Sequence, residues 1–287
     1  MSLAVTITIL IEDKAFHGGL KGEHGISMLI RLDNGKTVKS NVLFDTGQSG
    51  AFAENAQYLG KKISEVDSLI LSHNHYDHTG GVERFLELNN RALIYGHEKA
   101  FRASFSKAAK EEKIRKIGFP EGGLKLLNGL KEKVIKNSDP YRINESLLLT
   151  GSVPRKNDYE KVEPTIFTDK ECTHQDKIPD DQSLIINSGE EMLIVLGCCH
   201  SGIVNTIDYA REIMADKSIK AVIGGMHLVA SGSNRINAML KYLKKIDNLK
   251  IYHGHCTGLK AGCILNESFP ENARFISAGE TYKFILN

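Results

Sequence analysis

The sequence predicts an α/β protein in which two mixed β-sheets pack face to face between outer helices, an αβ/βα four-layer sandwich. Two observations support this fold. The chain divides into two halves, each with apolar strands followed by helices, and it shows no repeat at short period. At 287 residues, one such core would bury roughly three quarters of the unfolded surface. We therefore expect a single domain over residues 1–287.

The first half is rich in predicted strands. Residues 3–11 alternate apolar and polar side chains, and residues 28–32 and 37–44 flank an Asp-Asn-Gly-Lys turn. Asn-Gly between two apolar runs is a strong hairpin signal. Residues 66–71 form a further buried strand, and residues 80–88 a helix, with Thr79 and Glu83 spaced roughly as a capping box.

The second half predicts a regular alternation of strands and helices. Predicted strands cover 183–187, 192–196, 218–224 and 249–253, and predicted helices cover 202–215 and 234–246. A tight hairpin at 188–191 joins the first two strands. Three histidines, His200, His227 and His255, follow the ends of three successive strands, at the sheet edge where ligands gather in α/β proteins. A lone histidine of this kind more often packs in the core, but three at one edge favour metal ligation by His200 and His255.

A loop dense in ligand-type side chains lies between the strand at 66–71 and the following helix. It reads Ser72-His73-Asn74-His75-Tyr76-Asp77-His78-Thr79-Gly80-Gly81. Residues two apart in an extended segment face the same way, so His73 and His75 can approach one ion, while the turn brings Asp77 and His78 to a second position. Imidazole and carboxylate suit zinc, and also iron or manganese. The alternative is a polar surface loop, which this spacing disfavours.

The loop resembles the signature loop of the metallo-β-lactamase-fold superfamily, with its His-x-His-x-Asp-His pattern followed by two glycines. Three further stretches are similar to the other motifs of that superfamily: residues 43–47 around Asp45, 197–202 around His200, and 253–256 around His255. The Gly-Cys-Cys-His-Ser-Gly pattern, followed by Gly-Gly-Met-His-Leu at 224–228, is similar to a branch of metal-dependent hydrolases. Some members of that branch are linked to the making of a pterin-type coenzyme precursor in methanogens.

The resemblance implies the metallo-β-lactamase fold and a division of ligands between two ions. The first set would be His73, His75 and His200, and the second set Asp77, His78 and His255. Asp45 would support the loop by hydrogen bonds, because metal-bound histidines need acceptors on their second ring nitrogen.

The chain departs from better-known branches after the strand that ends at residue 224. Those branches place a bridging Asp, or a Cys in lactamases, where this chain has Gly225-Met226-His227. A histidine cannot bridge two ions through one oxygen. His227 could bind one ion, contact the substrate or do neither, and we expect it to face the substrate as a neutral hydrogen-bond donor.

These residues predict a metal-dependent hydrolase, or a branch-specific lyase or synthase, with a mono- or dinuclear centre. Bound zinc lowers the pKa of water to about 7 and so makes hydroxide available at neutral pH. Asp77 would bind metal and orient that hydroxide, and the substrate would be a small anionic or phosphorylated molecule. The alternatives are a non-hydrolytic redox or oxygen-binding iron protein and, less favoured, a nuclease. One or two transition-metal ions, zinc first, are the expected cofactors.

Residues 100–164 change character and predict an insertion on the active-site side of the fold. Within it, residues 100–116 have the pattern of an exposed amphipathic helix, and Arg155 is either a clamp for a substrate anion or a solvated surface residue. A glycine-rich loop at 17–25 is either a flexible connection or a rim over the substrate. The cysteines at 198, 199 and 256 stand beside ligand histidines, and packing of strand ends is favoured over thiolate ligation or redox chemistry.

The composition of the chain limits the classes of partner that we expect. A formal net charge of +2 makes no case for a nucleic-acid partner, because a protein that binds the nucleic-acid backbone should show a concentrated basic face. The absence of a ~20-residue apolar run excludes a membrane span. Five cysteines without a targeting segment indicate reduced thiols and a cytoplasmic location. We expect a small-molecule substrate, and the sequence carries no signal for an oligomeric state.

Overall fold

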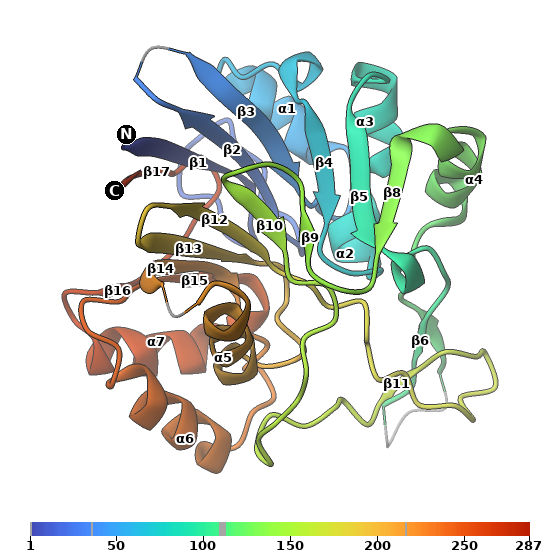
Figure 1. The fold of residues 1–287 in the computed structure, drawn as a ribbon. Coiled ribbons are helices and arrows are strands. Elements are labelled where there is room, and N and C mark those ends of the chain that lie inside the picture. The colour runs from blue at the N-terminus through green and yellow to red at the C-terminus, as the bar shows by residue number, and fades with distance from the viewer. Residues whose placement is uncertain (1, 36, 109–112, 216) are drawn as a thin grey trace.

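The computed structural model describes residues 2–35, 37–108, 113–215 and 217–287. Over these residues, two mixed seven-stranded sheets face each other, and a three-stranded sheet lies at one end (Figure 1). The first sheet has the order β17 (Thr281–Leu286), β1 (Leu3–Ile11), β2 (Ser27–Asp33), β3 (Val38–Phe44), β4 (Ser68–Leu71), β5 (Leu93–His97) and β8 (Val134–Asn137). The second has the order β16 (Ala273–Phe275), β15 (Lys250–Gly254), β14 (Ser218–Gly225), β13 (Glu191–Leu196), β12 (Leu184–Ser188), β10 (Leu147–Leu149) and β9 (Tyr141–Arg142). The small sheet has the order β11 (Ile166–Phe167), β6 (Phe105–Ser106) and β7 (Arg115–Lys116).

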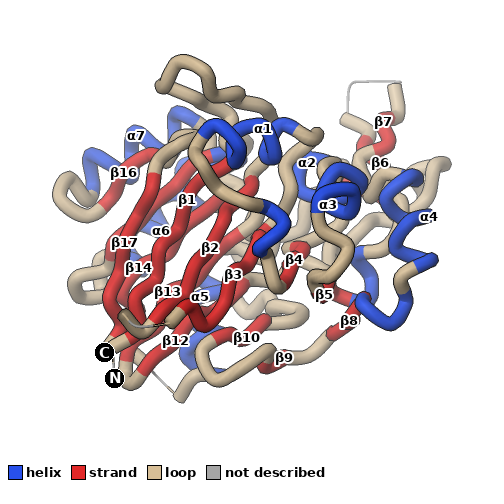
Figure 2. Tube along the Cα trace, turned by 90° about the horizontal axis from the view of Figure 1, so that it is seen from above, coloured by secondary structure: helices blue, strands red, loops and turns tan. Residues whose placement is uncertain are grey.

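Helices cover the outer face of each large sheet, so the layers are those of the predicted four-layer sandwich (Figure 1). The α-helices are α1 (Ala51–Tyr58), α2 (Tyr76–Thr79), α3 (Val82–Leu88), α4 (Glu121–Gly129), α5 (Ile203–Ile213), α6 (Ser233–Leu243) and α7 (Leu259–Ser268). Short 3-10 helices are η1 (Ile63–Glu65), η2 (Glu98–Ala100), η3 (Lys131–Lys133) and η4 (His255–Thr257). The long antiparallel strands of the first sheet run side by side in Figure 2, with α1 and α3 over one end.

Apolar side chains form three buried clusters that hold the layers together. The cluster between the sheets includes Ile7, Phe44 and Val195, all fully buried. One outer cluster packs α1, α3 and α4 on the first sheet, and the other packs α5, α6 and α7 on the second. Burial of these faces is the main driving force for the sandwich.

Both sheets become parallel where they carry the candidate site. In the first sheet, β3 pairs with β4 and β4 with β5 in parallel. In the second sheet, β13, β14 and β15 are parallel neighbours. The carboxyl ends of these strands therefore meet at one end of the sandwich, as expected for α/β architecture.

The structure confirms the predicted alternation of the second half, with element ends within a few residues of those expected. The hairpin at 188–191 is present, because Ser188, the last residue of β12, pairs with Glu191, the first residue of β13. The expected turn at 33–36 lies between the paired strands β2 and β3, although residue 36 is outside the described residues.

Two local predictions were wrong. The predicted capping box does not form, because the Thr79 hydroxyl donates to the His75 carbonyl, and α3 begins after Gly81. The helix predicted at 100–116 is replaced by β6 and β7, which pair with each other, and β6 also pairs with β11; residues 109–112 are outside the described residues. Strand pairing with a distant segment overrides the local helical pattern here.

None of the helices in the described part of the chain is long and apolar enough to cross a membrane.

Candidate metal centre

Three histidine rings from two loops converge at the end of the sandwich. The ring centroids of His73 and His75 lie 4.5 Å apart, and each lies 4.9 Å from the His200 centroid. Within the described residues, Nε2 of His73, Nε2 of His75 and both ring nitrogens of His200 are buried without a hydrogen-bond partner. A buried polar atom without a partner is costly, so this convergence has the character of a site prepared for an ion.

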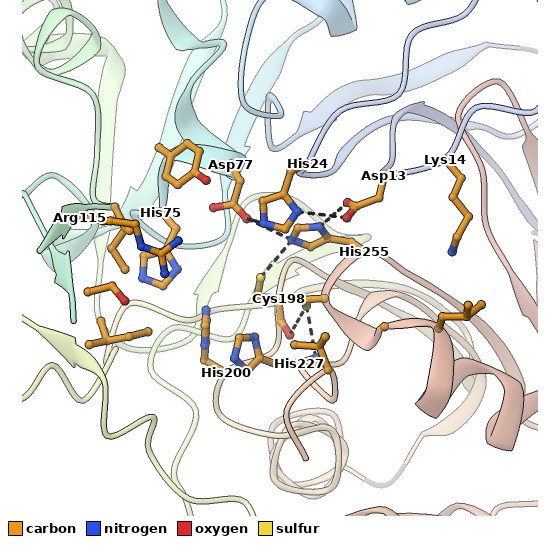
Figure 3. A pocket seen from close by; sticks show the side chains of 18 residues that line it. Asp13, Lys14, His24, His75, Asp77, Arg115, Cys198, His200, His227 and His255 are labelled. Atoms are coloured by element: carbon orange, nitrogen blue, oxygen red, sulfur yellow. Dashed lines mark hydrogen bonds and ion pairs between the residues drawn. The ribbon is translucent and has the colours of Figure 1, made fainter. Parts of the chain in front are cut away.

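A second set of ligand-type atoms lies beside the first. Oδ2 of Asp77 is 3.5 Å from His78 Nε2 and 3.2 Å from His255 Nε2. The Sγ atom of Cys198 is 3.1 Å from His78 Nε2 and 3.4 Å from His255 Nε2. Figure 3 shows His255 in contact with both Asp77 and Cys198, with His75 and His200 to one side. The residues predicted for the two positions are thus adjacent, and Cys198 lies among them.

Buried and half-exposed carboxylates fix which ring nitrogen faces the site. His78 Nδ1 lies 2.6 Å from Asp45 Oδ2, and His255 Nδ1 lies 2.8 Å from Asp13 Oδ1. The His73 Nδ1 atom lies 2.9 Å from Ser72 Oγ. When each Nδ1 carries its proton and donates it to these oxygens, each Nε2 keeps its lone pair for an ion.

Asp45 ties the two strand ends together and contacts the His78 ring at Nδ1, whereas Asp77 and Cys198 lie near Nε2 of the same ring. Its carboxylate is fully buried and accepts hydrogen bonds from the Ser72 backbone N–H and hydroxyl, each at 2.7 Å, besides the contact with His78. Asp77, in contrast, directs Oδ2 at the rings of the second set. Asp45 thus contacts the loop after β4 and Asp77 lies against the rings of the second set; their roles as support and as metal ligand stay predictions.

The backbone turns sharply at the strand ends that carry the site. Asp45, Cys199, His227 and His255 have positive φ values of 57°, 59°, 46° and 48°. Such conformations cost side-chain-bearing residues on the order of 1 kcal/mol or more each, and they tend to gather at functional sites. Gly197 is required at the end of β13, because a Cβ there would lie 2.1 Å from Ser72 Oγ.

Burial sets the charge of the ring cluster. Burial lowers the pKa of His73 and His200 well below the ordinary value and that of His75 to about 4, so these rings are neutral. Burial alone would raise the pKa of Asp77, but the charges of His78 and His255 outweigh it and hold this pKa well below its ordinary value. The neutral rings of His73, His75 and His200 are in the protonation state that a divalent ion requires. Burial lowers the pKa of His255, but Cys256, Asp13 and Asp77 outweigh burial and raise this pKa well above its ordinary value, so His255 would release a proton on binding an ion.

His227 stands next to His200, with 4.1 Å between the ring centroids. Its Nε2 lies 3.3 Å from Glu163 Oε1. Burial lowers the pKa of His227, but its contacts with Cys256 and Glu163 outweigh burial and raise this pKa to about 9. This direction favours a charged ring over the neutral imidazole expected from the sequence, and it depends on both Cys256 and Glu163, which are distant from His227 in sequence.

A cavity of about 410 Å³ opens over this cluster. Its walls include the ligand-type residues His75, Asp77, Cys198, His200, His227 and His255 and also Asp13, Lys14, His24 and Arg115 (Figure 3). This volume is in the range of small-molecule sites. Ser106, Arg115 and Ile117 bring the segment around β6 and β7 to the cavity wall.

The structure gives the positions of the other residues predicted from the sequence and of three further residues at the site that the sequence did not predict. Arg155 is not among the described residues that line the cavity; its Nη2 donates to the His200 carbonyl at 3.3 Å. His24, from the glycine-rich loop, lines the cavity, and its Nδ1 lies 3.1 Å from Asp13. Sequence reasoning missed Asp13, Arg115 and Glu163, which belong to no local motif and reach the site only through the fold.

Comparison with known proteins identifies relatives of the chain. Residues 22–159 match the family model for the metallo-β-lactamase superfamily. The chain is 33% identical to a 7,8-dihydropterin-6-methyl-4-(β-D-ribofuranosyl)-aminobenzene-5′-phosphate synthase of Methanocaldococcus jannaschii, over 98% of this chain and 97% of the relative. It is 32% identical to an uncharacterised protein of the same organism, over 89% of this chain and 91% of that protein.

Solved structures agree with these relatives. A metal-dependent hydrolase of the β-lactamase superfamily superposes with a TM-score of 0.78 and 26% identity, over 97% of this chain and 98% of that chain. A diphosphatase from the PhnP family shares the fold, with a TM-score of 0.53 and 14% identity, over 100% and 99% of the two chains. The chain belongs to the metallo-β-lactamase superfamily of metal-dependent enzymes.

Proposed function

We propose that the protein is a metal-dependent hydrolase that cleaves a small phosphorylated substrate. The observation that carries this proposal is the convergence of unpartnered, buried ring nitrogens on the floor of a cavity that also presents Arg115. The ring nitrogens would hold one or two transition-metal ions, and the nitrogen and carboxylate donors suit zinc first, with iron or manganese as alternatives.

The proposed ligands are His73, His75 and His200 for one ion and Asp77, His78 and His255 for the other. The bound ion would supply water of lowered pKa and polarise the ester oxygen. Asp77 Oδ2 faces His78 and His255, and in this proposal the carboxylate would orient the nucleophilic water and accept its proton. His227, on the opposite side of the cluster, would donate a hydrogen bond to the substrate oxygen that gains charge.

Arg115 is the proposed anchor for the substrate anion. It lines the cavity, whereas the ammonium group of Lys14, also at the cavity, lies 4.5 Å from the centroid of the Phe275 ring. A guanidinium group binds a phosphate through two parallel hydrogen bonds. Arg115 therefore takes the role for which the sequence offered Arg155.

The roles of the two aspartates give a test by metal binding. In Asp77→Asn we expect the second ion to be lost, because the amide has no charge and its oxygen is a poorer ligand. In Asp45→Asn we expect both ions to bind, with affinity reduced about 10- to 100-fold, as for other residues that orient a ligand histidine. Elemental analysis after titration of the apoprotein measures both, and the opposite pattern would reverse the two assignments.

His227 is tested by kinetics. His227→Asn should lower kcat on the order of 10²-fold, the loss found for a preorganised donor to a developing oxyanion, and leave metal content unchanged. Glu163→Gln should give a smaller loss, because Glu163 acts only through His227. An unchanged kcat in His227→Asn with full metal content would remove His227 from the reaction.

Arg115 is tested by the dependence of rate on substrate charge. Arg115→Ala should raise KM for a phosphorylated substrate about 10-fold or more, the loss of one charge-assisted pair worth roughly 1.5–3 kcal/mol. KM for an uncharged carboxylic ester should not change. Arg142→Ala, an exposed arginine of β9 away from the cavity, serves as the matched control, and equal effects of the two substitutions would refute the anchor.

The hydrolase proposal itself is tested with the purified, metal-loaded protein. We expect cleavage of at least one small phosphomonoester or phosphodiester, loss of this activity on chelation, and recovery on adding zinc, manganese or iron(II). A fully metal-loaded protein that cleaves none of these esters and no carboxylic ester would contradict hydrolysis.

The synthase relative supports a second candidate. Its identity of 33% extends over almost the whole of both chains, and its name describes a product that joins a dihydropterin to an aminobenzene carrying a ribofuranosyl phosphate. The phosphate of such a compound would suit Arg115. Mass spectrometry of a reaction between the aminobenzene ribofuranosyl phosphate and a dihydropterin whose 6-methyl carbon carries a leaving group distinguishes the two candidates. Synthesis gives the joined product and releases that group, whereas hydrolysis gives free phosphate or alcohol without a joined product.

A further inference from the structure

Cys198 lies among the proposed metal ligands, whereas its neighbour Cys199 does not. Cys199 belongs to the apolar cluster under α5, and its sulfur lies 3.4 Å from the Thr206 hydroxyl. The sulfur of Cys198 instead contacts Nε2 of His78 and of His255. The chain turns at Cys199, with φ 59°, and the adjacent cysteines thus have opposite surroundings.

The distances around the Cys198 sulfur match the edges of a tetrahedral zinc site. Bonds of about 2.0–2.1 Å to nitrogen and oxygen and 2.3 Å to sulfur place neighbouring ligand atoms about 3.3–3.6 Å apart in a tetrahedron. Four of the six distances among the ligand atoms of Asp77, His78, His255 and Cys198 are 3.1, 3.2, 3.4 and 3.5 Å, two within this range and two slightly below it. Three protein ligands of the second position and one sulfur therefore already outline a coordination shell.

The same sulfur also faces the first position. The ligand atoms of His73, Cys198 and His200 all lie within 4.8 Å of one another, as do those of Asp77, His78, Cys198 and His255. Cys198 is thus common to both groups. A thiolate sulfur has more than one lone pair, so it can bind two ions, which His227 cannot do through one atom.

We propose that the Cys198 thiolate is a metal ligand, which completes the Asp77, His78 and His255 set and is shared with the ion held by His73 and His200. As the sulfur–metal bond forms, the thiol proton leaves to solvent. This inference rests on the metal centre of the proposed function, but not on which substrate is cleaved. It replaces the favoured expectation that this cysteine only packs a strand end.

Cobalt(II) reports directly on thiolate ligation, because a cobalt–thiolate bond gives a charge-transfer band in the near ultraviolet. Apoprotein prepared with a chelator is titrated with cobalt(II) in the absence of substrate. We expect a band at the first equivalent, a further rise at the second, and loss of the band to background in Cys198→Ser. Cys199→Ser and Cys256→Ser are the matched controls and should keep it.

Three results would overturn the proposal: no thiolate band in the wild type, a band that survives in Cys198→Ser, or a band that depends on Cys256. A band that stops growing after the first equivalent overturns the sharing of the sulfur between two ions. X-ray absorption of the zinc-loaded wild type needs no variant and should show a sulfur at about 2.3 Å; its absence also contradicts the proposal.

The outcome is separable from that of the hydrolase test. If the protein shows the Cys198-dependent band but cleaves no ester, the hydrolase proposal is contradicted and the thiolate ligand is supported. An active hydrolase without the band would support hydrolysis and contradict the thiolate ligand.

Discussion

The centre depends on a hydrogen-bond network around the buried carboxylate of Asp45. This one side chain accepts hydrogen bonds from the Ser72 N–H and the Ser72 hydroxyl, and it contacts a ring nitrogen of His78. It thereby joins the end of β3 to the loop after β4 and fixes how His78 faces the site. Hydrogen bonds to an ionised acceptor are stronger than neutral ones. Removing the Asp45 carboxylate would leave several buried donors unpaired at once, and each unpaired donor costs free energy of folding.

Asp13 performs a comparable task from a different part of the chain. Its carboxylate contacts Nδ1 of His255 at 2.8 Å and Nδ1 of His24 at 3.1 Å. Unlike Asp45 it is partly exposed, with 35% of its side chain accessible, so it stands between the buried ligands and the cavity mouth. One side of the centre is thus fixed by a buried carboxylate, and the side nearer the substrate by one that solvent can reach.

The cavity combines a negative floor with cationic walls. The charges of His78 and His255 hold the pKa of Asp77 well below its ordinary value, and contacts with Cys256 and Glu163 raise the pKa of His227 to about 9. A divalent ion would be attracted to the floor, and an anionic substrate to Arg115, Lys14 and His227 on the walls. Such separation of charges within one cavity is what a metal-dependent reaction on an anion requires.

The layered fold and the histidine loop could be predicted from the sequence because their signals are local. The spacing of His73, His75, Asp77 and His78 and the strand periodicity around it are readable over a few residues. The contacts of Asp13 with His255 and of Glu163 with His227 join residues 242 and 64 positions apart in the chain, and no periodicity predicts them.

The wrong predictions also arise from contacts between parts of the chain that are distant in sequence or from local backbone turns. The lysine-rich segment at 100–116 has a helical pattern, yet β6 and β7 pair within a small sheet and bring Arg115 to the cavity. Cys198 and Cys199 share one interpretation from the sequence, because adjacent positions say little about which way each side chain points. The left-handed backbone at Cys199 separates their surroundings, and only the fold shows it.

The most direct test of the account is a crystal structure of the zinc-loaded protein with anomalous data at the zinc edge. We predict anomalous peaks between His73, His75 and His200 and between Asp77, His78 and His255, with the Cys198 sulfur beside both. Zinc bound elsewhere, or rings that turn away from the peaks, would contradict it.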